Sequence, residues 1–392
     1  MREVNTTLDD VTFSSIVRIR EKLMEYERRG EKTLRLESGE PNSDIPVLIE
    51  EEIIQAIRNK KTRYTPSTGI PELKAALFQQ HTLENKISLN SPDDIIITNG
   101  GMGAISSSLK AIINPYKRDE IIIPDPNWTP TREMICMHHG IPIPVALDVN
   151  NGFRLDPEKV KERITPRTKA IVINSPHNPT GAVYSRQDMR DLVRIVENSG
   201  IFLLSDEAYE DLIFEGEHVS PGSLSVYEGI ATLKTLSKRY SMTGLRVGSV
   251  ATKHKKLMQN LKKVVLYTVN GVSSITQYGS HKGALSGEVN RWIQETVASY
   301  KERRDILMEG IKASRHFECE TPQGAFYVFP KIVNYNGSDE DVKDILLDQN
   351  PHFGSVHGSS FGKAGEGHIR FAYSVSLEDV KTASEVIANL RI

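Results

Sequence analysis

The chain has 392 residues, of which 38% are hydrophobic and 26% are charged, and its formal net charge is -2. This composition is typical of a soluble globular protein. Because acidic and basic residues are mixed along the whole chain, we expect neither a nucleic-acid partner nor an anionic membrane surface. No run approaches the roughly 18 apolar residues of a membrane span, and the first residues lack the apolar stretch of a secretory leader. A cytoplasmic protein with small-molecule partners is therefore expected.

The two cysteines, Cys136 and Cys319, lie far apart and outside any C-x-x-C spacing. They therefore support neither a disulfide framework nor a zinc knuckle. The adjacent His138 and His139 lack the i, i+4 spacing of metal ligands on a helix. We expect no metal.

The first part of the chain predicts an arm, a helix and two loops. Apolar residues at three- and four-residue spacing favour an amphipathic helix within residues 5–30. A turn at Gly39 is either a plain turn or a place where the backbone meets a ligand. A second helix is expected near 48–59. Tyr64, in the loop that follows, is either a binding group or a packing residue.

From residue 93 the chain alternates short β-branched runs with helical stretches. The runs 95–97, 121–123, 171–173 and 201–204 are continuously apolar, as expected for parallel strands buried on both faces. Helices are expected at about 102–113, 130–139 and 186–199. This alternation predicts an α/β fold with a doubly wound, mostly parallel sheet, whose ligands collect outside the carboxyl ends of the strands.

The loops after these runs carry the residues of interest. Gly101 and Met102 open a helix after a glycine-rich turn, where free backbone N–H groups suit a phosphate. Trp128 is equally suited to stacking on a flat ring and to core packing. Asn178 lies in the loop after the third run. Asp206 ends the fourth run, where a carboxylate is costly without a cationic partner.

Two basic positions near the middle and end of the chain complete the pattern. Lys238 lies among small hydroxyl residues, with Arg246 eight positions on, which suits an amine that forms an imine beside a bound phosphate. The alternative is a solvated face of basic residues. Arg370 lies within an apolar strand at 368–372 and needs a planar anion, either a structural carboxylate or a substrate.

Taken in order, these segments resemble the pyridoxal-phosphate-dependent aminotransferases of fold type I, class I/II. The residues that carry the resemblance are 178–181 (Asn-Pro-Thr-Gly), 206–209 (Asp-Glu-Ala-Tyr), Ser237-Lys238, Arg246 and Arg370. The resemblance implies an arm and part of a small domain at 1–40, a large cofactor domain at 41–285, and the rest of a smaller α+β domain at 286–392. It also implies a homodimer.

The resemblance assigns roles to residues around the cofactor ring. Lys238 would hold the cofactor as a Schiff base and would move the substrate proton. Asp206 would keep the pyridine nitrogen protonated, so that the ring accepts electrons. Tyr209 and Asn178 would hydrogen-bond the ring O3′, and Trp128 would stack on the ring.

Other roles concern the phosphate and the substrate. The phosphate would lie at the helix start near Gly101 and Met102, and further donors would be Thr235, Ser237 and Arg246. The substrate α-carboxylate would bind Arg370, assisted by Asn178 and by the backbone at Gly39. Tyr64 would reach the phosphate of the neighbouring subunit.

The substrate is constrained only by departures from the family pattern. Met102 stands where some members selective for acidic substrates place a lysine, and a second arginine for a side-chain carboxylate is not recognisable. An unpaired side-chain carboxylate would be costly to desolvate. We therefore expect a neutral or aromatic donor to be preferred over aspartate, with an acceptor such as 2-oxoglutarate. Arg18 or Arg20 of the arm could reverse this preference.

Three alternatives differ in function. An aspartate-type aminotransferase would use the same site with acidic substrates. A β-eliminating lyase acting on cystathionine-like substrates would release ammonia and pyruvate. A transcription regulator with an aminotransferase-like domain would carry a DNA-binding segment ahead of the arm, and the residues before Gly39 are too few for one.

Overall fold

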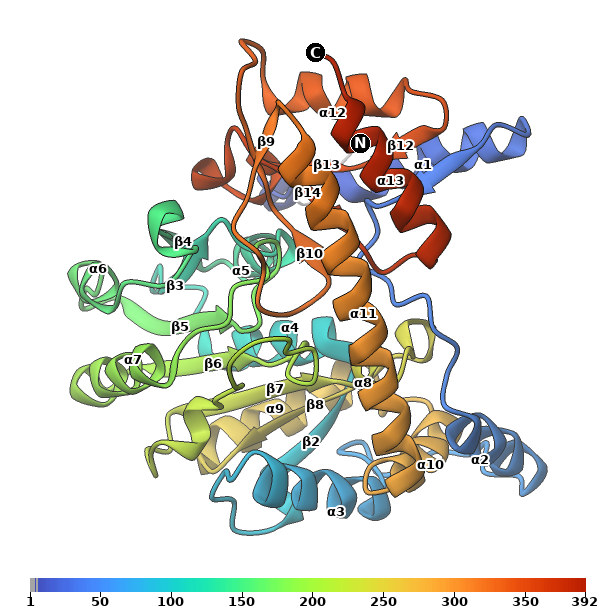
Figure 1. Ribbon diagram of the computed structural model, residues 1–392. Helices are drawn as coiled ribbons and strands as arrows, with labels where there is room; N and C mark the ends of the chain where they lie inside the picture. Colours follow the sequence, from blue (N-terminus) through green and yellow to red (C-terminus); the bar gives the residue numbers. More distant parts are fainter. Residues whose placement is uncertain (1–3, 5) are drawn as a thin grey trace.

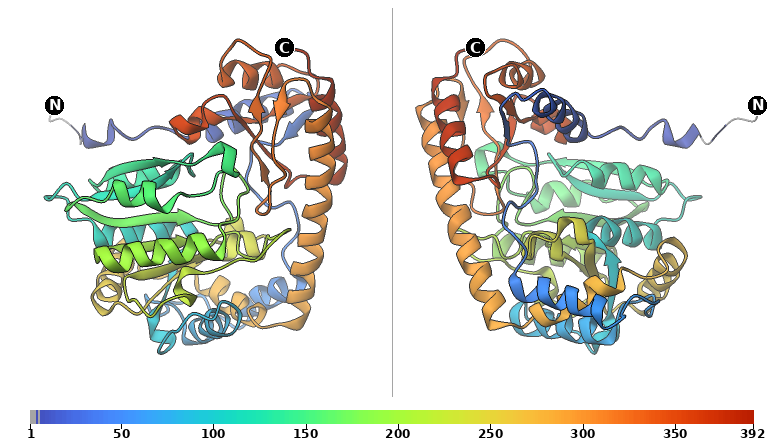
Figure 2. Two further views of the ribbon diagram at one scale, coloured as in Figure 1. Left: turned by 60° about the vertical axis from the view of Figure 1, so that its left-hand side comes forward. Right: turned by 90° about the vertical axis from the view of Figure 1, so that its right-hand side faces the viewer.

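The computed structural model describes residue 4 and residues 6–392 (Figure 1). A large sheet with helices on both faces occupies the lower part of that view, and a smaller body lies above it. Residues 1–3 and 5 of the expected arm lie outside the described residues. The start of the described chain, with the short turn at Thr6–Leu8, extends away from the rest of the molecule (Figure 2), whereas Thr12 donates two hydrogen bonds to the Glu133 carboxylate. Within the described part of the chain, every helix is too short or too polar to cross a membrane.

The large sheet has seven strands in the order β2-β8-β7-β6-β5-β3-β4. Along the chain they are β2 (Ile95–Asn99), β3 (Glu120–Asp125), β4 (Ile141–Ala146), β5 (Thr168–Asn174), β6 (Phe202–Asp206), β7 (Ile230–Thr235) and β8 (Val247–Thr252). Strand β8 is antiparallel to its neighbours β7 and β2, and the other neighbouring strands run parallel. The predicted mostly parallel α/β sheet is confirmed.

Helices cover both faces of the sheet because its strands are apolar on both sides. On one face, α4 (Gly100–Ile112), α5 (Pro130–Met137) and α9 (Lys255–Thr268) pack in one cluster with the strands. On the other face, α6 (Pro157–Glu162) and α7 (Arg186–Ser199) cover β3, β5 and β6. At the β2 end of that face lie α2 (Val47–Arg58), α3 (Pro71–Gln79) and α10 (Ser274–Gly283). The sheet is therefore doubly wound, as expected.

Helix α7 shows why these predictions were possible. Ser185 and Asp188 form a capping box at its start, and Gly200 ends it in the left-handed conformation. Its buried side chains, among them Met189 and Val193, recur at helical spacing and face the sheet.

Three strands of the sheet carry no clear signal in the sequence. Strand β4 contains Pro142 and Pro144, which suit its position at the edge of the sheet. Strand β7 carries the polar Thr232 and Lys234, and β8 contains Gly248 and Ser249. Their apolar character is diluted, although both strands are buried along their whole length.

The smaller body is built from helices and several short strands. The helices are α1 (Ser15–Arg28), α12 (Asp339–Leu347) and α13 (Leu377–Asn389). The strand groups are β1 (Thr33–Arg35) with β12 (His352–Gly354), β9 (Phe317–Glu318) with β11 (Lys331–Ile332), and β10 (Tyr327–Val328) with β14 (Ile369–Ala372) and β13 (Val356–His357). Strand β1 therefore pairs with a strand more than 300 residues later in the chain.

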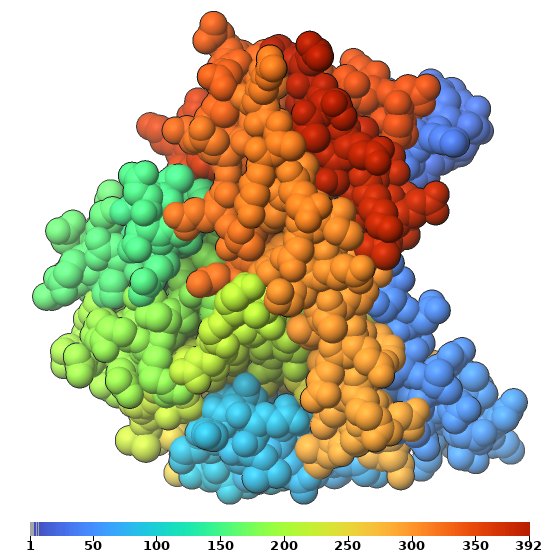
Figure 3. Space-filling model, in the orientation of Figure 1, coloured from blue at the N-terminus to red at the C-terminus, as the bar shows by residue number. Residues whose placement is uncertain are grey.

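Helix α11 (Gly287–Ala313) runs along both bodies (Figure 3). Near its start, Val289 packs in the cluster beside β2 and β8. Near its end, Leu307 and Ile311 pack in the cluster of the smaller body. One helix thus contributes to the two hydrophobic cores between which the site lies.

Candidate active site

The polar residues expected to carry chemistry gather at one edge of the large sheet. Asp206 and Thr235 end the parallel strands β6 and β7, and Asn178 follows β5. Strand β8 begins at this same edge because it is antiparallel, so Arg246, which precedes it, lies here too. Asn99 pairs with the first residue of β8, which brings the start of α4 to the same place.

Lys238 lies on α8 (Leu236–Arg239), a single helical turn directly after β7. The Thr235 hydroxyl caps this turn by accepting a hydrogen bond from the Ser237 backbone N–H at 3.2 Å, and it bonds the Ser237 hydroxyl at 2.9 Å. The Lys238 amine donates to the carbonyl oxygen of Gly39, which comes from the segment leading out of the smaller body. Burial lowers the pKa of Lys238 to about 8. A substantial neutral fraction near neutral pH is what a nucleophilic or basic amine requires.

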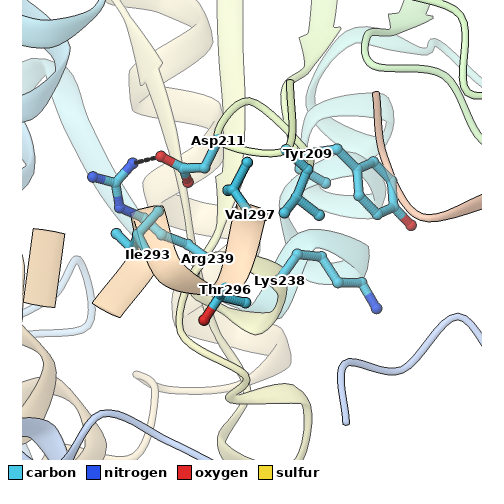
Figure 4. Close-up of a pocket in the computed structure, with 9 residues that line it drawn as sticks. Tyr209, Asp211, Lys238, Arg239, Ile293, Thr296 and Val297 are labelled. Carbon is cyan, nitrogen blue, oxygen red and sulfur yellow. Dashed lines mark hydrogen bonds and ion pairs between the residues drawn. The ribbon is translucent and has the colours of Figure 1, made fainter. Parts of the chain in front are cut away.

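The two basic residues of this turn point in different directions. In Figure 4, the Lys238 amine lies on the same side as the Tyr209 hydroxyl, whereas Arg239 points to the opposite side and meets Asp211. The Arg239–Asp211 ion pair is 2.6 Å long. Arg239 therefore anchors the turn, and Lys238 is left for the site.

Asp206 is buried at the end of β6, and this burial raises its pKa to about 7. One of its oxygens accepts a hydrogen bond from the backbone N–H of Ala208 at 3.2 Å. Among the described residues it has no salt-bridge partner, although a buried carboxylate is costly without one. The position is thus suited to a ligand that carries a positive charge.

Arg370 connects the smaller body to the site. It is only 1% exposed, and its guanidinium donates to the Asn178 side-chain oxygen at 3.1 Å and to the Glu37 carbonyl at 2.6 Å. The Asn178 amide donates to the Tyr209 hydroxyl at 3.4 Å. The Nε of Arg370 is buried without a hydrogen-bond partner among the described residues. No described carboxylate makes a salt bridge with Arg370, so of the two partners expected for it, an anionic ligand is favoured.

Tyr327 is a member of this cluster that sequence reasoning missed. Its hydroxyl bonds that of Tyr209 at 2.8 Å, and the Arg370 guanidinium lies 4.6 Å from its ring centre. A Cβ at Gly39 would lie 2.1 Å from the Tyr327 hydroxyl, so Gly39 permits this close approach. The aromatic run at 326–329 was the available signal.

The start of α4, together with Arg246, forms an open group of donors. Gly100 has a φ of +67°, and a Cβ there would lie 2.6 Å from the Arg246 guanidinium. A Cβ at Gly101 would lie 3.4 Å from the side chain of Thr235. The N-cap residue, Asn99, makes no side-chain cap, so the first N–H groups of this 13-residue helix stay open. Backbone donors, a hydroxyl and a guanidinium that converge in this way suit a phosphate.

Three expected binding residues lie farther from these contacts. Trp128 is half-buried after β3 and packs against the sheet cluster. Met102 is 45% exposed on α4, and Tyr64 is 91% exposed in the loop between α2 and α3. Within the described residues no hydrogen bond joins these side chains to the Lys238 cluster.

A second missed group lies behind Asp206. The Glu207 carboxylate is fully buried and accepts hydrogen bonds from Ser205 at 2.9 Å and from Ser220 at 2.7 Å, and it pairs with His218 at 3.1 Å. Glu207, His218 and Glu210 offer ligand atoms within 4.8 Å of one another, as a metal site would. These atoms already have partners, including a lysine 2.6 Å from Glu210, so the group is better described as a hydrogen-bonded support for the β6 loop.

Comparison with known proteins identifies the family. Residues 31–387 match the family model described as aminotransferase class I and II. The chain belongs to this family. The aspartate/prephenate aminotransferase of Thermus thermophilus is 34% identical over 391 residues, covering 100% of this chain and 99% of the relative. The aspartate aminotransferase of Rhizobium meliloti is 32% identical over 395 residues, covering 97% of this chain and 94% of the relative.

Solved structures of aminotransferases have the same fold. The Thermus thermophilus aspartate aminotransferase with maleate superposes with a TM-score of 0.94 at 34% identity, covering 99% of each chain. An alanine aminotransferase from Pyrococcus furiosus gives a TM-score of 0.92 at 28% identity, covering 99% of this chain and 100% of that chain. The predicted family, fold and enzymatic class of this aminotransferase are confirmed.

Proposed function

We propose that this aminotransferase binds pyridoxal 5′-phosphate at Lys238 and moves an amino group from an α-amino acid to a 2-oxo acid. The observation that carries the proposal is a buried amine of lowered pKa, with an anion-binding group at α4 and a buried, unpaired carboxylate, Asp206, at the same sheet edge. These match the aldehyde, phosphate and pyridine nitrogen of the cofactor. When bound, the cofactor supplies an electron sink for the carbanion at the substrate α-carbon.

The chain offers a residue for each part of the cofactor. We assign the phosphate to the backbone at Gly101 and Met102 and to the side chains of Thr235, Ser237 and Arg246. We assign the ring to Asp206, Trp128, Tyr209 and Asn178. A buried carboxylate beside the ring nitrogen favours the protonated nitrogen, because the opposite charges stabilise each other where water is excluded.

Lys238 and Arg370 act on the substrate. With its lowered pKa, Lys238 is suited to take a proton from the substrate α-carbon and return it at the acceptor atom. Arg370 is suited to hold the α-carboxylate, since its unpartnered Nε and adjacent N–H groups form a fork of donors. Asn178 and the backbone of Gly39 orient the same end of the substrate.

We also propose the domain division 1–40, 41–285 and 286–392, with a homodimer as the working form. The separate hydrophobic clusters of the two bodies support the division. The exposed Tyr64 supports the dimer, together with Ile57 and Tyr267, which are 51% and 84% exposed. Large side chains that are exposed on one subunit are available for contact with a second subunit. The composition agrees with a cytoplasmic location.

The substrate preference stays a prediction. The exposed Met102 offers an apolar contact and no charge, which supports a neutral or aromatic donor over aspartate. The relatives named as aspartate or aspartate/prephenate aminotransferases favour the alternative, an acidic substrate. Steady-state kcat/KM across amino-acid donors with 2-oxoglutarate distinguishes the two. Release of ammonia and pyruvate would instead identify a β-eliminating lyase.

The lysine assignment is tested by Lys238→Ala, with the exposed Lys256→Ala as a matched control. Loss of positioned proton transfer alone should reduce turnover by roughly 10²–10⁴-fold, whereas the control should keep wild-type turnover. After borohydride reduction, mass spectrometry should find the cofactor attached to the wild type and the control but absent from Lys238→Ala. Full attachment in Lys238→Ala would contradict the assignment.

A further inference from the structure

An acidic residue lies beside the reacting lysine and has no role in the proposed chemistry. Glu40 directly follows Gly39, whose carbonyl accepts the hydrogen bond from Lys238. One Glu40 oxygen pairs with the Arg20 guanidinium at 3.0 Å, and the other accepts a hydrogen bond from the Thr243 hydroxyl. The Glu40 and Arg20 side chains are 48% and 46% exposed, so both are accessible to a ligand from solution.

The two partners of Glu40 come from different bodies of the molecule. Arg20 lies on α1, whose Ile19 and Leu23 pack in a cluster of the smaller body. Thr243 lies on the loop before β8, and its carbonyl accepts a hydrogen bond from Arg246 of the anion-binding group. Glu40 therefore joins the helix of the arm to the edge of the large sheet, one residue after the carbonyl that accepts the Lys238 hydrogen bond.

The charge of Glu40 reaches the place where a substrate would react. Burial lowers the pKa of Lys238, and of the charged groups acting on this amine Glu40 opposes that shift most strongly. An acidic substrate side chain near the same place would be repelled by the Glu40 carboxylate. Arg20 could attract it, because within the described residues only one of its terminal nitrogens has an acceptor.

We propose that the Arg20–Glu40 pair is the selectivity element for the substrate side chain, in which Arg20 is the cation that an acidic side chain binds and Glu40 competes with that side chain. While the two are paired, their charges offset each other, and an uncharged side chain meets no unpaired charge beside them. An acidic side chain must compete with Glu40 for the Arg20 guanidinium. This inference rests on the proposed function, which places the substrate beside Lys238.

Opposite effects are expected from the two charge-removing variants. Glu40→Gln frees Arg20 and should raise the ratio of kcat/KM for glutamate to that for phenylalanine by roughly threefold to tenfold, whereas Arg20→Gln should lower it by a similar factor. Calorimetric titration of each holoenzyme with maleate, a dicarboxylate without an amine, should show tighter binding to Glu40→Gln and weaker binding to Arg20→Gln.

Arg18→Gln is the matched control, because it removes the same charge from another exposed position of the same helix, α1. Burial and charge repulsion by Arg18 lower the pKa of His357 of β13, and within the described residues Arg18 does not pair with Glu40. The glutamate-to-phenylalanine ratio of kcat/KM and the maleate affinity of Arg18→Gln should therefore equal those of the wild type. Shifts in the same direction for Glu40→Gln and Arg20→Gln, or an equal shift in Arg18→Gln, would overturn the selectivity role. A wild type that transfers no amino group would reject the proposed function, and the maleate affinities would still decide the role of the pair.

Discussion

Asp206 is the residue whose environment most opposes its charge. Burial raises its pKa to about 7, above the ordinary 3.8, so between these values the folded protein binds more protons than the unfolded chain. Stability of the cofactor-free protein therefore falls as the pH rises from about 4 to 7. The Asp206→Asn variant has no carboxyl group to ionise at this position, so it lacks this loss of stability. In urea unfolding at pH 8, we expect the cofactor-free variant to be roughly 1–4 kcal/mol more stable than the wild type.

The difference should shrink at pH 4.5, where the wild-type carboxyl group is protonated in the folded state. With the cofactor bound, the wild type should be more stable than Asp206→Asn, because asparagine cannot hold a charged ring nitrogen. For the same reason, the turnover of the variant should be nearly lost. Asp44→Asn, at an exposed position, should show no such pH dependence. A stability gain of equal size at both pH values would show that Asp206 is not under this electrostatic strain.

At the residue scale, the sequence predicts those functional residues that stand out by their type and by their order along the chain. Asp206 ends an apolar strand, where a carboxylate needs a reason, and Lys238 lies among small hydroxyl residues with Arg246 eight positions on. Tyr327 could not be predicted as a site residue, because its contact with Tyr209 joins positions 118 residues apart. Glu207 could not be predicted for a related reason, because only the fold shows that His218 pairs with it.

At the scale of elements, the start of α4 can be tested with a pair of glycines. Gly100 and Gly200 have φ angles of +67° and +65°, so alanine at either position should cost about 1–2 kcal/mol of stability. A Cβ meets no atom within 4 Å at Gly200, but at Gly100 it meets the Arg246 guanidinium at 2.6 Å. The contacted atoms at Gly100 are the end of a long, flexible side chain that can move aside, so urea unfolding should show similar losses for the two variants.

Ligand binding should distinguish the Gly100→Ala variant from the Gly200→Ala variant. Gly100→Ala displaces Arg246 and should weaken pyridoxal 5′-phosphate binding about tenfold, a loss of roughly 1.4 kcal/mol. Binding of pyridoxal, which lacks the phosphate, should change little, and Gly200→Ala should bind both ligands as the wild type does. Fluorescence titration measures these affinities. Equal weakening for both ligands would mean that Gly100 does not serve the phosphate.

Elements were predictable where local pattern and burial agree. The capped, amphipathic α7 was expected at its observed bounds, and the continuous apolar runs of β5 and β6 were expected within three residues of theirs. Strands β7 and β8 were not expected, because Lys234 and Gly248 dilute their pattern. The antiparallel direction of β8 places Arg246 at the site, and that direction depends on pairing across the sheet instead of on local sequence.

At the scale of the whole molecule, the two bodies meet at the site but belong to separate hydrophobic cores. Arg370 crosses between them by donating to Asn178, and Lys238 does so through Gly39. These contacts join residues up to 199 positions apart, so composition and periodicity alone could not place them. Only the order of the motifs along the chain, through the family resemblance, brought them together in advance.

The proposed dimer leads to a test in which two defective subunits restore each other. If Tyr64 serves the neighbouring site, a mixed dimer of Lys238→Ala and Tyr64→Ala subunits contains one complete site, built from Lys238 of one subunit and Tyr64 of the other. Tyr64 is 91% exposed within its own subunit, as a residue that acts across an interface must be.

Refolding the two variants together should therefore give more activity than the sum of the separately refolded variants. Because random pairing makes about half of the dimers mixed, the recovered activity should approach a quarter of the wild-type value. The control is the Tyr64→Ala variant refolded alone under the same conditions. If the mixture is no more active than this control, Tyr64 acts in the site of its own subunit or outside the reaction.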